Sequence, residues 1–366
     1  MRSLIGFAVL IPLASLVACL PVAPAVTPLP SPTPPPIPTR IRSTNTPLPD
    51  PSPTPSEPAM IRLTEPGCCA QPFWSPDGQE VRFIDRPEPT APTGIYGVSV
   101  EGGTVHLVSE RIGLPSPDGR YLAYLDEQGE TVVEDTVYNQ RWTIPNGGRR
   151  VFFSPNSVRL AWAAIFDTGS FDRQRVVVSI SDVDGSNARE VITIYGGGIA
   201  GWLDDEHLLL AGKDAPDDEE AALFSLSILD GSRHVLVRNQ NVRSVSIAPG
   251  GEWILYTITL DTEQPENNGL WVIRADGGWH YRLEVVGSAR WRDGSHLLVI
   301  PMELNTPSHR IWQFDAETGH AMPLTDPQHL SFRVQAGDWS VSPTGEFVVF
   351  VNAEDQALWL ITLPPL

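Results

Sequence analysis

The chain has 366 residues and a formal charge of −19 at pH 7, from 44 Asp and Glu against 25 Lys and Arg. A phosphate backbone would be repelled by that charge, so nucleic acid is excluded as an expected partner. The length suffices for one large domain or two ordinary ones.

The first 19 residues are typical of an export signal. Arg2 supplies a positive start, and residues 4–18 form an apolar stretch too short for a comfortable membrane span. The stretch ends in Leu-Val-Ala-Cys, which resembles a bacterial lipobox. That resemblance implies lipidation at Cys19 and a lipid anchor on the outer face of the bacterial cell membrane. The alternative is an ordinary secretory signal with an incidental cysteine.

Residues 20–58 are rich in Pro, Thr and Ser. Such a segment cannot bury a core, so an extended, partly polyproline II tether is expected, with a contour of roughly 120 Å at about 3.1 Å per residue. SH3-type recognition is the alternative for proline-rich runs. Beyond the tether lie two adjacent cysteines, Cys68 and Cys69, which allow a vicinal disulfide, a metal-binding pair or two free thiols.

From residue 59 onward, a turn of the Ser-Pro-Asp-Gly type recurs every forty-odd residues. Proline presets φ, aspartate bonds locally and glycine accepts a positive φ. Seven copies occur, three of them clear and four degenerate, beginning at Ser75, Ser116, Ser342, Ser154, Ala248, Trp291 and Trp202.

An apolar strand follows each turn, for example residues 81–84 or 347–350. A third and a fourth strand follow in each unit, often joined by an Asp-Gly hairpin signal. Seven units of four strands predict a seven-bladed, all-β propeller with antiparallel blades and twenty-eight strands over residues 59–366. The seventh unit stops after its third strand, 358–362, and the lone strand 60–64 is expected to complete it and close the ring.

These turns, with the aromatic or apolar residue before them and the strand after them, resemble the TolB-type, WD40-like propeller repeat, which also occurs in the N-terminal propeller of dipeptidyl-peptidase IV-like proteins. The resemblance implies the fold and leaves function open, because this repeat serves many roles. No Gly-x-Ser-x-Gly elbow and no His-Glu-x-x-His motif occurs in the chain. The sequence therefore predicts no catalytic residues, no metal site and no cofactor.

Propellers usually bind ligands where the fourth-to-first and second-to-third strand loops gather. The expected fourth-to-first loops are 65–72, 109–115, 145–150, 194–201, 238–244, 285–290 and 325–338. Three of them carry an arginine five residues before the turn, namely Arg111, Arg149 and Arg243, and the longest carries His329 and Arg333. Convergent guanidinium groups would clamp a carboxylate or phosphate. The alternative is pairing with neighbouring acids or exposure on a solvated rim.

The sequence thus favours a lipid-anchored binding or scaffold module that recognises a protein, peptide or envelope glycan with its loop-rich face. On this interpretation the chain touches the membrane through the Cys19 lipid alone. Two alternatives stay open. One is a propeller-type lyase or hydrolase acting on an extracellular polymer, and the other is a small-molecule sensor with a pocket near the three arginines.

Overall fold

The computed structural model describes residues 58–68, 70–166, 169–239, 241–303 and 306–366, all within the unit Arg40–Leu366. Cys19 and the predicted signal and tether therefore lie outside the described residues. The described part is all-β apart from two short 3-10 helices, η1 (Phe171–Arg173) and η2 (Pro265–Asn267). Neither helix is long and apolar enough to cross a membrane.

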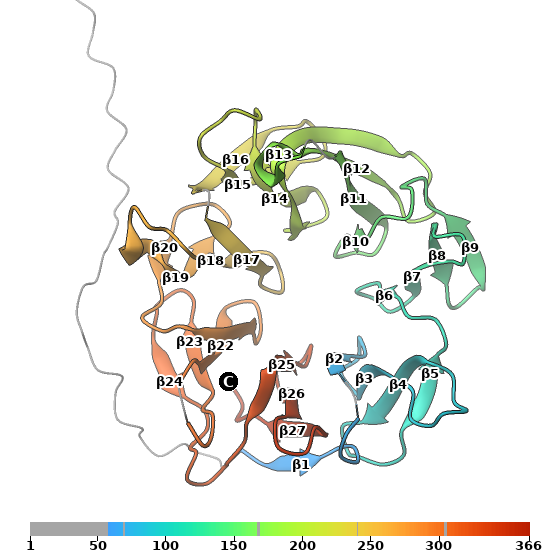
Figure 1. The fold of residues 1–366 in the computed structure, drawn as a ribbon, viewed down its shortest axis with the longest axis vertical. Coiled ribbons are helices and arrows are strands. Elements are labelled where there is room, and N and C mark those ends of the chain that lie inside the picture. The colour runs from blue at the N-terminus through green and yellow to red at the C-terminus, as the bar shows by residue number, and fades with distance from the viewer. Residues whose placement is uncertain (1–57, 69, 167–168, 240, 304–305) are drawn as a thin grey trace, which may run out of the picture. The chain divides into compact units, whose positions relative to one another are not determined.

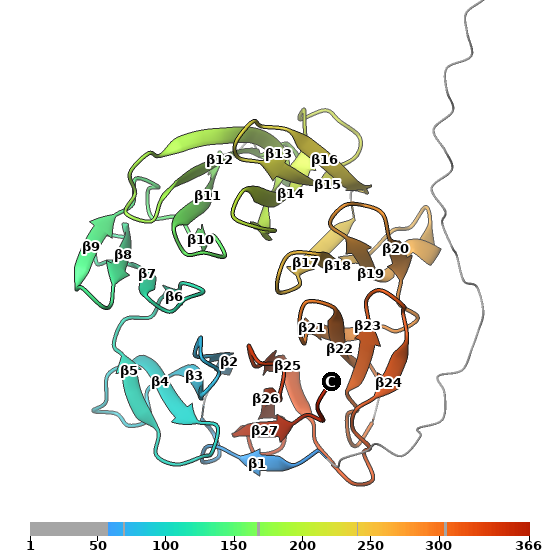
Figure 2. The same cartoon turned by 180° about the vertical axis from the view of Figure 1, so that it is seen from behind.

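Antiparallel sheets follow one another around a ring (Figures 1 and 2). The first sheet contains β2 (Ala70–Trp74), β3 (Glu80–Asp85), β4 (Gly94–Ser99) and β5 (His106–Ser109). The second contains β6 (Leu114–Pro115), β7 (Tyr121–Leu125), β8 (Thr131–Asp135) and β9 (Gln140–Thr143). The next contains β10 (Val151–Phe153), β11 (Arg159–Phe166), β12 (Arg175–Asp182), β13 (Arg189–Trp202), β14 (His207–Lys213), β15 (Ala222–Ser227) and β16 (Arg233–Arg238). The fourth sheet contains β17 (Val242–Ile247), β18 (Trp253–Ile258), β19 (Gly269–Arg274) and β20 (His280–Arg282). The fifth contains β21 (Gly287–Trp291), β22 (His296–Pro301), β23 (Trp312–Asp315) and β24 (Ala321–Pro323). The last sheet has the order β1 (Met60–Arg62), β27 (Leu358–Thr362), β26 (Phe347–Asn352), β25 (Val334–Val341).

The propeller prediction is confirmed, but the prediction of seven four-stranded blades is wrong. The described residues form five four-stranded sheets and one continuous seven-stranded sheet, with 27 strands in all. The cause is β13, which pairs with β12 along its first half and with β14 along its second. Residues 194–201, expected as a loop, lie within this strand.

Glycine explains why β13 continues where a loop was expected. The four residues from Tyr195 to Gly198 lie opposite the three from Lys213 to Ala211 on β14, and a second register shift follows between Ile199 and Gly201. Each shift is a bulge that bends the strand without ending it. A side chain at Gly197 would place its Cβ 1.9 Å from the carbonyl oxygen of Ala211, so the bend needs a residue without one.

The seven turn motifs form a closed collar at one end of the ring. Each turn touches the next: Asp118 N–H donates to Ser157 Oγ (3.2 Å), and Asn156 N–H donates to Asp205 Oδ1 (2.9 Å). The other neighbours meet at glycines, and these contacts are Gly78 with Thr344, Gly119 with Pro76, Gly251 with Leu203, Gly294 with Pro249 and Gly345 with Arg292. Seven turns accompany six sheets because two units of the repeat share β13.

The strand after each turn is covered on both faces. Leu208, Leu209 and Leu210 in β14 are fully buried, as are Val348 and Val349 in β26. Side chains of adjacent sheets pack together in shared clusters. The apolar runs of the sequence therefore fill the spaces between sheets, as predicted.

The two ends of the described chain meet in the last sheet. β1 pairs with β27 from Met60↔Ile361 to Arg62↔Trp359. The Leu63 amide donates to the Leu358 carbonyl (2.8 Å), and the Leu358 amide donates to Thr64 Oγ1 (2.9 Å). The early strand thus pairs as expected and covers an edge of the last sheet. Nearby, Cys68 is disulfide-bonded, while Cys69 lies outside the described residues.

Candidate functional site

The ring has two chemically different ends. The turn end carries the seven-turn collar and the hairpins between third and fourth strands. The loop end carries the connections that leave the second and fourth strands, namely the described parts of 63–69, 86–93, 110–113, 126–130, 144–150, 169–174, 214–221, 239–241, 259–268, 283–286, 302–311, 324–333 and 353–357. Every predicted ligand-binding residue lies at the loop end.

Arg111 is paired with a neighbouring acid. Its Nη1 donates to Glu134 Oε2 at 2.9 Å, and its guanidinium lies over the Tyr124 ring at 5.3 Å. Glu134 is buried and also accepts from Arg141 at 3.2 Å. A buried carboxylate between two guanidinium groups is a satisfied structural arrangement, and it agrees with the alternative stated for this arginine.

Arg149 and Arg243 line two different cavities. The Arg149 cavity, of about 310 Å³, also includes Trp162, Phe166 and Glu190. The Arg149 Nη1 donates to the carbonyl of Asn146 within its own loop. Neither this cavity nor the one below is lined by two of the three predicted arginines.

The second cavity, here called the Lys213 cavity, has a volume of about 350 Å³. It lies beside the bulge of β13, and its lining includes Phe171, Asp172, Gly196, Gly197, Lys213, Asn239, Asn241 and Arg243. Lys213, the only lysine of the chain, is half-buried at the end of β14. Among the described residues its ammonium has no hydrogen-bond or ion-pair partner. Its uniqueness in the sequence was the one available signal, and uniqueness alone does not indicate a cavity.

Arg333 and His329 are exposed at the loop end. His329 Nδ1 lies 3.1 Å from Asp326 Oδ2, and its side chain is 65% exposed. Backbone N–H donation from Gln328, with the nearby His329 ring, holds the pKa of Asp326 below its usual value. The pair organises its own loop, and neither residue lines the Lys213 cavity.

Exposed apolar side chains gather at the loop end, a feature that sequence reasoning missed. Of the twenty large apolar side chains exposed among the described residues, five lie in the loop-end connections, namely Ile112, Phe171, Leu260, Val286 and Met302. Five more lie at the strand ends next to these connections, namely Ile84, Leu114, Leu125, Ile165 and Phe166. The turn end has six: Val137, Tyr138, Val158, Leu229, Trp279 and Leu366. Periodicity could not reveal the difference, because these residues lie at strand ends or in the connections between strands.

Leu260 is the most exposed member of this set, at 85%, and it adopts a left-handed φ of 60°. A branched residue in this backbone region is strained. The loop is held in place by buried Asp261, whose Oδ1 accepts from the Gln264 amide (2.9 Å) and whose Oδ2 accepts from Asn267 Nδ2 (3.2 Å). The same backbone hydrogen bond is the main cause of a lowered pKa of Asp261.

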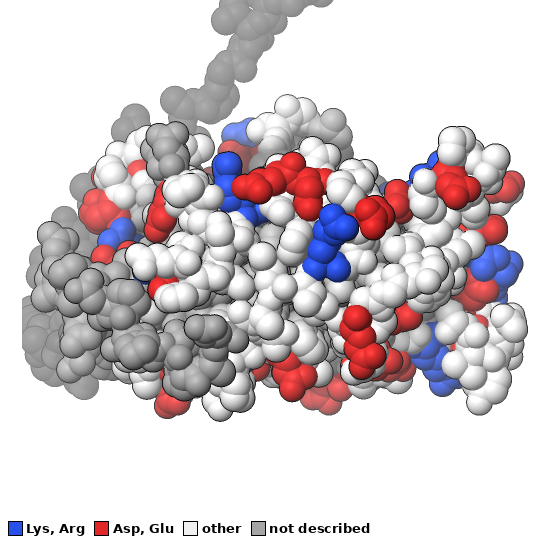
Figure 3. Space-filling model, turned by 90° about the horizontal axis from the view of Figure 1, so that it is seen from below, with Lys and Arg blue, Asp and Glu red and all other residues white. Residues whose placement is uncertain are grey.

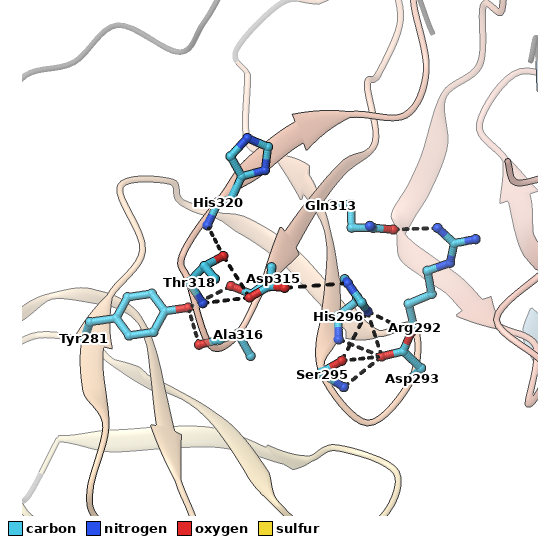
Figure 4. A network of polar contacts seen from close by, with 10 residues as sticks. All are labelled: Tyr281, Arg292, Asp293, Ser295, His296, Gln313, Asp315, Ala316, Thr318 and His320. Atoms are coloured by element: carbon cyan, nitrogen blue, oxygen red, sulfur yellow. Dashed lines mark hydrogen bonds and ion pairs between the residues drawn. The ribbon is translucent and has the colours of Figure 1, made fainter. Parts of the chain in front are cut away.

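A polar network at the turn end has the residue types of an acid–base site (Figure 4). His296 Nδ1 lies 2.9 Å from Asp293 Oδ2, and its Nε2 lies 3.8 Å from Asp315 Oδ2. Burial opposes ionisation of Asp293, yet donation from the Ser295 and His296 amides lowers its pKa overall. The same Asp-x-x-His contact recurs at Asp204 and His207, at 2.9 Å, in another turn of the collar. Its recurrence identifies the arrangement as part of the turn.

The side of the ring visible in Figure 3 carries carboxylates along both edges and isolated cationic groups between them. No group of three or more His, Cys, Asp or Glu side chains among the described residues is arranged to hold a metal ion.

No protein-family model matches the chain, and no curated protein sequence matches it significantly. Similar solved structures include an oligogalacturonate lyase in complex with manganese, with a TM-score of 0.57 and 14% identity over 84% of this chain and 98% of that one. The β-propeller domain of the Trilobed protease from Pyrococcus furiosus has a TM-score of 0.55 and 15% identity over 81% of this chain and 96% of that one. The RRP9 WD40 repeats have a TM-score of 0.51 and 15% identity over 84% of this chain and 99% of that one. At such identities the likeness shows the β-propeller fold alone. It confirms the predicted resemblance at the level of fold.

Proposed function

We propose that this chain is an exported, lipid-anchored binding module that recognises a protein or peptide partner with its loop end. The observation that carries the proposal is the gathering of ten exposed apolar side chains at that end. Exposed apolar surface marks interaction sites in soluble proteins where it is contiguous. The strained, outward-facing Leu260 supports recognition through the same end, because strain of this kind concentrates at functional sites.

An envelope glycan is the alternative ligand of this module. Exposed aliphatic side chains such as Leu125, Leu260 and Met302 suit a protein surface better than a sugar, because they offer apolar area without hydrogen-bonding groups. Cys19 and the proline-rich segment 20–58 support export and anchoring on sequence grounds.

The test compares the two ends of the ring. Wild-type protein, a loop-end variant (Leu125→Ser, Leu260→Ser, Met302→Ser) and a turn-end control (Val137→Ser, Leu229→Ser, Trp279→Ser) are crosslinked in native membranes, purified and analysed by mass spectrometry. We expect one stoichiometric protein partner with wild type and control, and its loss from the loop-end variant. Equal recovery by all three, or no protein partner with any, would contradict the proposal.

Anchoring is tested separately. Cys19→Ser is expected to move the chain from the membrane fraction to the soluble extracytoplasmic fraction, because the lipid supplies the membrane affinity. Unchanged membrane retention would contradict lipidation at this cysteine.

A further inference from the structure

We infer that the ring opens laterally between its first sheet (β2–β5) and its second sheet (β6–β9), while the seams between the other sheets stay closed. A seam is here the surface where two adjacent sheets face each other. The two sheets are neighbours in the ring (Figures 1 and 2), and their turns touch where a Cβ at Gly119 would lie 2.7 Å from Pro76 Cγ. The inference concerns a movement of the scaffold and does not rest on the proposed protein partner.

The other five seams of the ring are filled by apolar side chains. Five clusters of buried apolar side chains each join two adjacent sheets, and a sixth lies within the seven-stranded sheet. Among the described residues, none of these six clusters contains side chains of both the first and the second sheet. Burial of apolar surface is the dominant favourable term in packing, so the seam between these two sheets is held less strongly than the others.

The first sheet presents charged groups to this seam. Val81 and Phe83 pack against the last sheet, so the alternating residues Glu80 and Arg82 of β3 face the second sheet. Glu80 accepts from Arg82 Nη2 at 3.4 Å and lies 3.3 Å from His106 Nε2. The Nε of Arg82 is buried and has no hydrogen-bond partner among the described residues. A buried donor without a partner costs free energy, and water entering an opened seam would remove that cost.

The second sheet presents charged groups from the other side. Ala123 and Val133 pack against the seven-stranded sheet, so Glu134 faces the first sheet. Glu134 is paired with Arg111, which comes from the connection between the two sheets, and with Arg141 of its own sheet, at 2.9 and 3.2 Å. Within the described part of the chain, no ion pair of either face crosses the seam. Each sheet therefore keeps its own ion pairs when the two sheets separate.

The seam is closed in the structure. Ile95 of β4 and Val132 of β8 face it from opposite sides, and they are 4% and 7% exposed. Opening would bring both side chains into contact with water, while the connection 110–113 keeps the two sheets joined. Local openings of this kind occur where few buried apolar contacts oppose them.

The experiment is labelling of single introduced cysteines in the full chain by iodoacetamide under native conditions, with the label located by mass spectrometry. Val132→Cys reports on the seam. Val133→Cys is the matched control on the same strand, since its side chain is fully buried against the seven-stranded sheet. Val334→Cys is the control for static exposure, because Val334 is also 7% exposed and lies in the seam between the fifth and last sheets. We expect Val132→Cys to react about tenfold faster or more than either control.

Ile95→Cys reports from the other side of the seam and should also react faster than both controls, because one movement exposes both positions. Its rate, like that of Val132→Cys, should change little in denaturant too dilute to unfold the protein. Folding of each variant is verified by its melting temperature. Equal rates for Val132→Cys and Val334→Cys, slow labelling of Ile95→Cys, or a rate that rises with denaturant as steeply as global unfolding would each overturn the inference.

Discussion

The turn end and the loop end of the ring use their polar groups differently. At the turn end one arrangement repeats: Ser116 Oγ donates to Asp118 Oδ1 (2.6 Å) and accepts from the Tyr121 amide (2.9 Å), and Ser75 makes the same pair of contacts with Asp77 and Glu80. At the loop end each connection is held by its own contacts, and apolar side chains face solvent. The comparison indicates that the turn end stabilises the ring, and it agrees with the proposal that recognition takes place at the loop end.

Removal of the closing strand should have the largest effect on stability. A chain lacking residues 59–65 loses the β1–β27 ladder and the burial of Leu63, for an expected cost of about 4 kcal/mol or more. Denaturant unfolding measures this cost. Unfolding at the wild-type midpoint would show that closure of the ring by β1 contributes nothing.

Substitution of Arg292, a residue of the collar, should have the next largest effect on stability. This arginine occupies the position of the turn serine, and it is buried among carbonyls of the last sheet. Its Nε donates to the Gly345 carbonyl (2.9 Å) and its Nη2 to that of Pro364 (2.5 Å), while Nη1 donates to Gln313 Oε1 (2.5 Å).

Arg292→Met leaves those three acceptors without their donor and should cost about 3 kcal/mol in unfolding free energy. The control Arg62→Met removes an exposed cation whose contact with Glu65 is 3.6 Å, and it should change stability by less than about 0.5 kcal/mol. Similar losses for both variants would contradict a special role for the buried guanidinium.

How far the sequence predicts this molecule depends on how local the interactions are. The turns are local, because Ser, Pro, Asp and Gly act within five residues. Five of the seven were placed correctly, and the two expected to begin at Trp202 and Trp291 begin one residue later, because both tryptophans end strands. The fused sheet was not predicted, since Gly196, Gly197 and Gly198 indicate a loop until their bulged pairing with β14 is seen. The Arg292 contacts were equally inaccessible, because Pro364 lies 72 residues further along the chain.

The candidate site was predicted less well, for the same reason. The predicted residues lie at one end of the ring, but Arg111 is paired with buried Glu134, and the three arginines do not share a cavity. Lys213 lies opposite Tyr195, where the bulge of β13 begins. Its place on the cavity lining therefore depends on a feature of the fold that the repeat did not indicate.

A single turn hydroxyl should have a moderate effect. Ser116→Ala removes both contacts of that side chain and leaves the buried Tyr121 amide without its acceptor, at an expected cost of about 1–2 kcal/mol. Ser186→Ala, in the exposed β12–β13 hairpin, is the matched control and should stay within about 0.5 kcal/mol of wild type. Equal effects would mean that position in the collar confers no advantage.

At the loop end a substitution should raise the free energy of unfolding instead of lowering it. Leu260→Asn relieves a left-handed backbone strain that asparagine tolerates and should stabilise the fold by about 0.5–1 kcal/mol. The same variant should weaken retention of the protein partner in the crosslinking experiment. A loss of stability would contradict the inference that this side chain is held outward at a cost to the fold.

Acidification should have the smallest effect on stability, and it tests the turn end selectively. Donation from the Ser75 hydroxyl lowers the pKa of Asp77 below its usual 3.8, and the Gln79 amide acts in the same direction. Because the unfolded chain then binds more protons than the native one, stability is retained above pH 3.8 and falls as pH drops through the lower native pKa. Asp77→Asn should therefore flatten the dependence of unfolding free energy on pH below 3.8. The turn itself should survive, since the third turn uses Asn156, whose Oδ1 lies 2.8 Å from Ser154 Oγ. A variant with the wild-type slope in this window would mean that the hydroxyl of the turn does not stabilise the ionised carboxylate.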